Sequence, residues 1–240
     1  MKAFLAAVSS VPVVLAFWLG ISCTPALARD FDAGLDFLVG LPQDEFRDRI
    51  EDEGYGVSGH FGYFLGHLPV MIGADIGYLN YGTETRHEPF SFTIPEVIVK
   101  VRTTNNILML HGFARLQPRE GPVRPYVEGL WGFKYLFTRT SIEDDFFDQR
   151  IASFTNFDDL AQSWGVGTGF DIRLWSSSHP SGRGLADVSL NVSARYLWGS
   201  EADYLRKGSI QRDFDGSVIF LVERSRTDML IPQIGIRVRF

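Results

Sequence analysis

The chain has 240 residues, in which 23 Lys and Arg stand against 29 Asp and Glu, so its formal net charge is −6. This mild acidity comes without any stripe of clustered basic residues. It argues against nucleic acid as a partner, because a phosphate-binding surface needs clustered Lys and Arg. The length suits a single domain.

The amino terminus predicts a secretory signal peptide over residues 1–28. Lys2 gives a positive start, residues 4–21 are mainly apolar, and Ala26-Leu27-Ala28 has the small-x-small pattern of a cleavage site. The apolar stretch is interrupted by Pro12 and is followed at once by the cleavage pattern. We therefore expect it to be removed rather than to span a membrane.

The one cysteine, Cys23, lies inside this leader, so the chain from Arg29 onward has no disulfide, thiol nucleophile or thiolate metal site. Lipidation of Cys23 is the alternative, but it requires small residues just before the cysteine. Gly20, Ile21 and Ser22 fit that requirement poorly.

Eight later segments alternate between apolar and polar or small residues, which is the period-two pattern of a β-strand. They span residues 31–40, 55–65, 70–78, 108–116, 126–137, 164–174, 188–198 and 230–240. The fourth is the least regular, because Met109 and Phe113 stand at its polar positions. No remaining window has about 18 apolar residues, so a membrane location would require a closed barrel, whose backbone groups are all paired.

The last segment alternates without a miss and stops on a phenylalanine, with Ile234, Ile236, Val238 and Phe240 on its apolar side. In this feature the chain resembles the bacterial outer-membrane β-barrels, among them the small eight-stranded barrels of the outer-membrane protein A and X type. The resemblance implies that these four residues form the membrane-insertion signal read by the barrel-assembly machinery.

The two faces of the strands differ in chemistry. The polar face is rich in glycine and carries charges of both signs, which can pair inside a narrow barrel. Its titratable residues are Asp32, Asp36, His60, Asp75, His111, Arg115, Glu128, Lys134, Asp171, Arg173, Arg195, Arg237 and Arg239. The apolar face carries aromatics near segment ends, as the girdles at lipid interfaces do: Tyr78, Phe137, Trp164, Tyr196 and Trp198.

We therefore predict an eight-stranded antiparallel transmembrane β-barrel, an up-and-down meander over residues 29–240, with a polar lumen and a lipid-facing apolar exterior. The alternative is a soluble lipocalin-like barrel, which turns its apolar residues inward around a ligand and its charges out to water.

Connection lengths support the membrane hypothesis. The connections at 66–68, 117–124 and 176–184 are short, whereas those at 41–54, 82–106, 139–161 and 199–228 are longer. Short periplasmic turns and long external loops are typical of outer-membrane barrels, so both termini are expected to be periplasmic. Residues 96–102 and 217–223 are also strand-like and would allow ten strands. We interpret them as extensions of the fourth and eighth strands above the membrane.

Sequence motifs for chemistry are weak. Ser58 and His60 share one strand face and Asp75 lies on the next strand, so a Ser/His/Asp hydrolase set is conceivable. No nucleophile elbow accompanies them, and we interpret all three as lumen residues in a hydrogen-bond network. The acidic run Glu143-Asp144-Asp145 with Asp148 lacks the spacing of a calcium loop. We expect no enzymatic activity, cofactor or metal.

The sequence predicts a scaffold barrel of the bacterial outer membrane, whose plugged polar lumen supports long loops outside the cell. Eight strands leave just enough interior for side chains. The expected partners are outer-membrane lipid, lipopolysaccharide and the barrel-assembly machinery, and the protein is expected to be a monomer. Arg206, Lys207 and Arg212 would lie near the outer rim, where they could contact lipopolysaccharide phosphates.

The main alternative is a small pore or a carrier for hydrophobic molecules. It draws support from the apolar residues that fall on the inner face, which are Leu38, Phe64, Met109, Phe113 and Leu130. A lipid-modifying barrel enzyme is a further, less favoured alternative.

Overall fold

The structure is a computed structural model that describes residues 30–50, 52–91, 94–144, 150–177, 185–212 and 218–240. The predicted signal peptide lies outside these residues. The elements are β1 (Phe31–Pro42), α1 (Asp44–Arg49), β2 (Gly54–Phe64), β3 (Val70–Ser91), β4 (Ile94–Leu116), β5 (Val123–Asp144), β6 (Arg150–Ser176), β7 (Asp187–Gly199), β8 (Glu201–Tyr204), β9 (Ile210–Arg212), β10 (Val218–Phe220), β11 (Glu223–Arg226) and β12 (Met229–Arg239).

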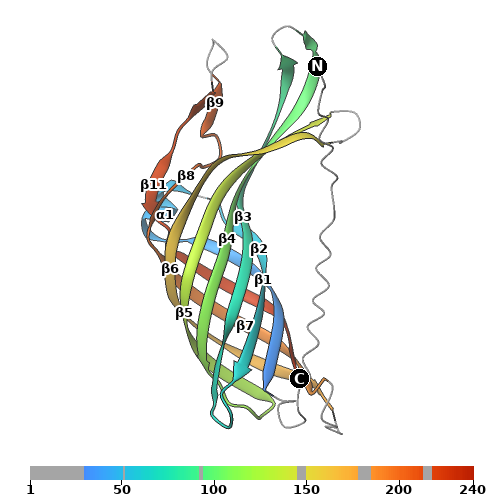
Figure 1. Ribbon diagram of the computed structural model, residues 1–240, viewed down its shortest axis with the longest axis vertical. Coiled ribbons are helices and arrows are strands. Elements are labelled where there is room, and N and C mark those ends of the chain that lie inside the picture. The colour runs from blue at the N-terminus through green and yellow to red at the C-terminus, as the bar shows by residue number, and fades with distance from the viewer. Residues whose placement is uncertain (1–29, 51, 92–93, 145–149, 178–184, 213–217) are drawn as a thin grey trace, which may run out of the picture.

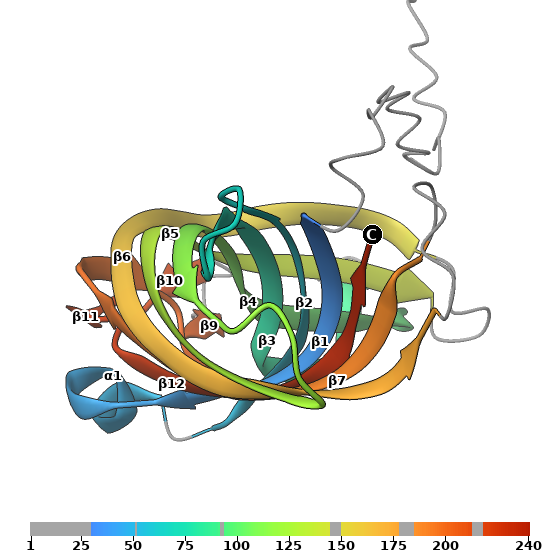
Figure 2. The same ribbon diagram turned by 90° about the horizontal axis from the view of Figure 1, so that it is seen from below.

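Eight of the strands close into a barrel in the order β1-β12-β7-β6-β5-β4-β3-β2, and each is antiparallel to both neighbours. Figure 2 shows this ring from below. The first and last strands complete the ring, where Phe31 N–H donates to Phe240 O at 3.1 Å and Phe240 N–H to Phe31 O at 3.0 Å. The predicted eight-stranded meander is confirmed, and with it the likeness in fold to small outer-membrane barrels. The ten-strand alternative is wrong.

Strand lengths divide the barrel into two halves. β1, β2, β7 and β12 have 12, 11, 13 and 11 residues, whereas β3, β4, β5 and β6 have 22, 23, 22 and 27. The four long strands continue past the ends of the short ones as a curved wall (Figure 1). We call this end of the molecule the long-strand end.

Most of two predicted loops is therefore strand. The β3–β4 ladder continues to the pair Ser91 and Ile94, and the β5–β6 ladder to Glu143 and Arg150. Residues 96–102 belong to β4, as predicted. These ladders persist because each added residue finds a backbone partner on its neighbour, so the chain gains hydrogen bonds instead of leaving loop groups to water.

The second predicted extension, residues 217–223, is wrong as an extension of the last strand. β10 pairs with β9, and β11 pairs with β8, in two separate two-stranded sheets. Leu221 and Val222 lie between β10 and β11, and Thr227 and Asp228 lie between β11 and β12. The ladder of β12 with β7 begins only at the pair Met229 and Leu197, although β7 runs on to Gly199. The N–H of Gly199 donates to the side chain of Asp228 at 2.8 Å and not to a strand.

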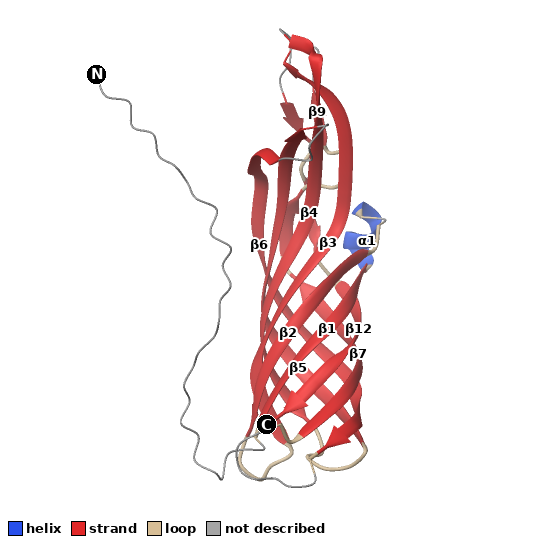
Figure 3. Ribbon diagram, turned by 90° about the vertical axis from the view of Figure 1, so that its right-hand side faces the viewer, coloured by secondary structure: helices blue, strands red, loops and turns tan. Residues whose placement is uncertain are grey.

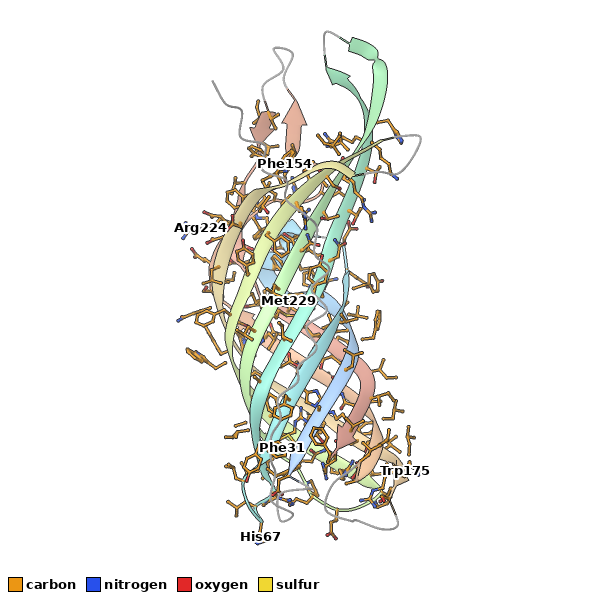
Figure 4. All side chains as sticks on the ribbon, turned by 45° about the vertical axis from the view of Figure 1, so that its right-hand side comes forward. Phe31, His67, Phe154, Trp175, Arg224 and Met229 are labelled. Carbon is orange, nitrogen blue, oxygen red and sulfur yellow. The ribbon has the colours of Figure 1, made fainter. Side chains whose placement is uncertain are left out.

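The opposite end carries the short connections, and we call it the short-turn end. β1 begins there and β12 ends there (Figure 3). His67, in the turn between β2 and β3, lies at its tip (Figure 4). α1 has six residues and lies above the short strands β12 and β7 (Figure 3). In the described part of the chain, no helix has the length and apolar character needed to cross a membrane.

Alternation along the strands separates the inner and outer faces of the barrel. Outward residues such as Leu35, Leu110 and Trp131 are 66%, 55% and 61% exposed, whereas the inward Arg195 and Asp75 are 3% and 4% exposed. Figure 4 shows apolar side chains projecting outward around the lower barrel, with Trp175 near the short-turn end. The soluble alternative, with an apolar interior and a charged surface, is wrong for this chain.

Two glycines of β5 differ in how closely the neighbouring strand approaches them. A Cβ on Gly132 would collide with the carbonyl oxygen of Leu110 and the Cα of His111 on β4, and neither backbone atom can rotate away. A Cβ on Gly129 would meet nothing within 4 Å. We expect Gly132→Ala to lower the free energy of unfolding by about 1–3 kcal/mol through overpacking, and Gly129→Ala to leave it nearly unchanged.

Guanidinium unfolding in detergent micelles, followed by tryptophan fluorescence, measures both variants. Equal midpoints for the two variants would contradict the close approach of β4 and β5 at Gly132.

Candidate functional site

The centre of the barrel holds a carboxylate between two guanidinium groups. Arg115 donates from Nη2 and Nε to Glu128 Oε2 at 2.6 and 2.9 Å, and Arg195 donates from Nε to Glu128 Oε1 at 2.7 Å. Arg195 Nη1 also lies 3.0 Å from Asp75 Oδ1. All four side chains are at most 3% exposed. Such charge-assisted pairs are the strongest hydrogen bonds in proteins.

A glycine makes this arrangement possible. Glu128 on β5 and Arg195 on β7 are separated by β6, whose residue at this register is Gly167. A Cβ on Gly167 would lie 2.8 Å from Glu128 Oε1 and 3.0 Å from Arg195 Cγ. The two charged side chains therefore meet across β6 in the space that Gly167 leaves.

A second group of contacts fixes His60 between two carboxylates. Its Nε2 lies 3.0 Å from Asp32 Oδ1, and its Nδ1 lies 3.6 Å from Asp36 Oδ2. Asn191 Nδ2 donates to Asp36 Oδ1 at 2.7 Å. Ser58 Oγ has no hydrogen-bond partner in the described part of the chain. The conceivable hydrolase set is thus not assembled, because His60 faces Asp32 and Asp36, whereas Asp75 pairs with Arg195.

Tyr126 joins these groups toward the short-turn end. Its ring lies between the guanidinium of Arg115, 4.2 Å from the centroid, and that of Arg237, at 4.8 Å. Its hydroxyl accepts from Arg237 Nη2 at 2.8 Å and donates to Asn191 Oδ1 at 3.0 Å. Arg237 Nε lies 3.3 Å from Asp171 Oδ1. A polarisable ring between two cations adds cation–π stabilisation to the ion pairs.

Every buried carboxylate in the described part of the chain has a cation or His60 beside it. Each buried carboxylate lies within 4 Å of an arginine or of His60; these carboxylates are Asp30, Asp32, Asp36, Asp75, Glu128, Asp171, Asp187 and Asp228. An unpaired buried charge would be very costly, so the pairs are needed for folding rather than added to a fold that could stand without them.

An apolar layer fills the interior toward the long-strand end. Its buried side chains include Leu38, Leu79, Ile107, Met109, Leu136, Leu197, Met229 and Ile231. Lys134 is fully buried beside this layer and donates from Nζ to Leu197 O at 3.3 Å and to Thr227 O at 2.5 Å. Through these two bonds, Lys134 of β5 ties the segment between β11 and β12 to the barrel. Nearby, His111 Nε2 lies 3.0 Å from Ser163 Oγ.

Beyond this layer, α1 packs on two tyrosines. Phe46, which is fully buried, meets the Tyr204 ring edge-on at a centroid distance of 5.2 Å and the Tyr81 ring at 6.3 Å. Tyr204 Oη shares a hydrogen bond of 2.7 Å with Ser225 Oγ. Burial raises the pKa of both tyrosines, and Tyr204 raises that of Tyr81 further. Both hydroxyls therefore stay protonated at neutral pH.

Of the charged and histidine residues predicted for the lumen, all are buried in the interior except Arg173, which is half-buried at the short-turn end. The sequence analysis missed Asp187 and Arg124, which form a bidentate pair at 2.8 and 3.0 Å. Both continue the inward alternation of their strands by one step, Arg124 before Tyr126 and Asp187 before Ser189. Extending each segment by two residues would have found them.

The predicted aromatic residues lie on the outer face, near the level where the short strands end. Tyr78 and Trp164 are each 43% exposed, and Phe137, Tyr196 and Trp198 are half-exposed. The hydroxyl of Tyr78 donates to Asn106 Oδ1 at 2.7 Å, and that of Tyr196 to Asp44 Oδ2 at 3.0 Å. These tyrosines place a ring on the apolar belt and a hydroxyl on its polar border.

A second aromatic cluster, not predicted, surrounds the chain end at the short-turn end. The Phe31 ring lies 5.6 Å from Phe61, 5.1 Å from Tyr63 and 6.2 Å from Phe240. Phe240 is thus part of the seam between β1 and β12. Ile234 and Ile236 are 50% and 44% exposed on the outer face of the same strand, which also carries Val238.

The described residues contain no group of three or more His, Cys, Asp or Glu side chains that could hold a metal ion. Part of the acidic run at 143–148 lies outside the residues that the structure describes. The interior side chains that the structure describes pair opposite charges and fill the space inside the barrel.

No family model matches the chain, and no curated protein matches its sequence. Two solved structures are similar to it in fold. Neisserial surface protein A is 14% identical, with 88% of this chain and 97% of that chain covered and a TM-score of 0.40. A major outer membrane protein from Thermus thermophilus is 11% identical, with 88% and 99% covered and a TM-score of 0.39. Similarities at this level assign no activity, ligand or partner to this chain.

Removing the central carboxylate should cost far more than removing an exposed one. We expect Glu128→Gln to lower the free energy of unfolding by about 3–5 kcal/mol, because it leaves Arg115 and Arg195 buried without this counter-charge. The matched control is Glu201→Gln, whose partner Arg224 lies 3.1 Å away with both side chains at least 60% exposed. Its expected cost is below about 1 kcal/mol.

Guanidinium unfolding in detergent micelles gives both values. Similar losses in the two variants would show that the central pairs do not stabilise the barrel.

Proposed function

We propose that this protein is an integral barrel of the bacterial outer membrane, in which a plugged lumen supports a rigid structure outside the cell. The single observation that carries the proposal is the inverted distribution of polarity: charged side chains are buried inside a closed barrel, and large apolar side chains cover its outside. In water, so large an apolar exterior would be unfavourable; in lipid, it is the stable arrangement.

Strand lengths support the same proposal. A strand tilted across a bilayer needs about 9–11 residues. β1, β2, β7 and β12 have between 11 and 13 residues, so they are long enough to span and little more. The additional residues of β3 to β6 then form a wall that stands outside the hydrocarbon region.

The proposed orientation places the short-turn end, with both ends of the barrel, in the periplasm. Outer-membrane barrels have short periplasmic turns and longer external connections. The wall formed by β3 to β6, with α1 and β8 to β11, would then be displayed at the cell surface. This external part is the proposed scaffold for contacts outside the cell.

The proposed role is non-enzymatic, since His60 is held by Asp32 and Asp36 and is not hydrogen-bonded to Ser58. The carrier alternative receives less support, because the inner apolar residues fill space instead of lining an open path. Leu38 and Phe64 are 0% exposed, and Met109, Phe113 and Leu130 are 3%, 5% and 5% exposed.

The proposed partners are outer-membrane lipid, lipopolysaccharide and the barrel-assembly machinery, with the barrel itself a monomer. The last strand offers the machinery its outward residues Ile234, Ile236, Val238 and Phe240. Arg206 and Lys207 are 52% and 57% exposed and face carboxylates at 3.6 and 4.0 Å, so a lipopolysaccharide phosphate would compete with those pairs. The side chain of Arg212, predicted with them, lies outside the described residues.

The membrane location predicts a depth-dependent cost of outward charge. Leu110, 55% exposed, lies on the outer face of the ring, where β4 pairs with Ile76 of β3 and Phe133 of β5. Leu160 of β6, 58% exposed, lies closer to the long-strand end. We expect Leu110→Arg to cost about 2–4 kcal/mol in phospholipid vesicles and Leu160→Arg about 0–1 kcal/mol. Guanidinium unfolding in vesicles measures both.

Cell fractionation is the companion test of location, with the protein expected in the outer-membrane fraction. Recovery in the soluble periplasmic fraction, or equal costs for the two arginine variants, would refute the proposal.

The plugged lumen predicts that the barrel does not conduct. In planar bilayers we expect no stable, large single-channel steps, because paired charged side chains and an apolar layer fill the narrow interior. A large-pore porin inserted in the same lipid serves as the positive control. Long-lived openings of porin-like size from this protein would show that the plug is displaced or incomplete.

A further inference from the structure

A hollow of about 440 Å³ opens at the short-turn end, beside the last residues of β12. Three arginines line it: Arg119 from the β4–β5 turn, Arg173 from β6 and Arg239 from β12. Asp187 and Glu120 are the two carboxylates in the lining. The hollow therefore gathers guanidinium groups from three separate parts of the chain.

The carboxylates near this hollow do not neutralise the charge of all its arginines. Asp187 accepts from both Nη atoms of Arg124, at 2.8 and 3.0 Å. Arg119 is paired with Asp30. Glu120 is exposed to solvent, where its charge is screened. Arg173 has no carboxylate within ion-pair distance in the described part of the chain, and Arg239 shares Asp32 with His60.

Arg239 has unused donors although it is only 4% exposed. Its Nη1 donates to Arg119 O at 2.8 Å, and its Nη2 forms an ion pair with Asp32 Oδ2 at 3.6 Å, which is too long for a hydrogen bond. Its Nε and Nη2 have no hydrogen-bond acceptor among the described residues. Buried donors without an acceptor are costly, and an oxygen supplied by a ligand removes that cost.

Arg173 lines the same hollow from β6, where it pairs with Ser189 of β7. Its Nε is buried and has no acceptor in the described part of the chain, and no described carboxylate lies within ion-pair distance of it. The Phe64 ring lies beside Arg239, with its centroid 4.7 Å from the guanidinium carbon. Both guanidinium groups thus line the hollow and carry N–H donors that lack an acceptor among the described residues.

We propose that this hollow binds a phosphate group through Arg173 and Arg239. Guanidinium forks match the oxygens of phosphate, and a tetrahedral anion can accept from two arginines on different strands at once. The same group is carried by free inorganic phosphate and by the headgroup of an anionic phospholipid such as phosphatidylglycerol. The site is distinct from the ion pairs of the barrel centre.

The test follows the Nε–H signals of arginine by NMR in the folded, full barrel. One arm titrates inorganic phosphate against chloride at equal ionic strength, with the protein in zwitterionic detergent micelles. The other arm compares nanodiscs of phosphatidylcholine alone with nanodiscs that contain phosphatidylglycerol. We expect saturable shifts of the Arg173 and Arg239 signals in at least one arm, and the responding arm identifies the source of the phosphate.

Arg173→Gln should weaken the apparent affinity roughly tenfold in the responding arm, as expected for loss of a charge-assisted hydrogen bond. The matched control is Arg224→Gln, which removes an exposed cation on β11 and should leave the affinity unchanged. Absence of saturable shifts in both arms would overturn the proposal. So would equal affinities for the native protein and Arg173→Gln. The titration of the native protein stands even if the variant fails to fold.

Discussion

The structure depends on pairing opposite charges inside a closed ring of strands. A barrel this narrow must fill its interior with side chains, and in this chain many of those side chains are ionised. Each buried carboxylate can remain there only because a cation, or His60, lies beside it. The central contacts of Glu128 with Arg115 and Arg195 join three strands, so they also fix how the strands are placed around the ring.

Glycine makes that pairing possible. Gly167 leaves the space through which Arg195 on β7 reaches Glu128 on β5, and Gly132 allows β5 to approach the backbone of β4 closely. The glycine-rich inner face is therefore complementary to the long arginine side chains. Where glycine is absent, Tyr126 and Phe64 present flat faces on which guanidinium groups stack.

Unequal strand lengths give the molecule two regions with different surroundings. The short strands and the lower parts of the long ones form the ring with the apolar exterior. Above it, β3 to β6 continue as a wall, and Phe46 of α1 packs against Tyr81 and Tyr204 at its base. Lys134 connects the regions, since it lies on the wall and donates to the carbonyl of Thr227 just before β12.

The sequence by itself determined the strands of the ring, their inward and outward faces and the charged positions of the lumen. Period-two alternation is a local property, and a single slip would turn Arg195 toward the outside. The partners were decided only by the tertiary structure. Nothing local in the chain tells His60 to contact Asp32 and Asp36, or Asp75 to contact Arg195, because ring closure and strand register set those distances. The same holds for the predicted extension at 217–223, whose strand-like pattern is compatible with any free edge. Its described residues Val218–Phe220 pair with β9, and Glu223 pairs with β8.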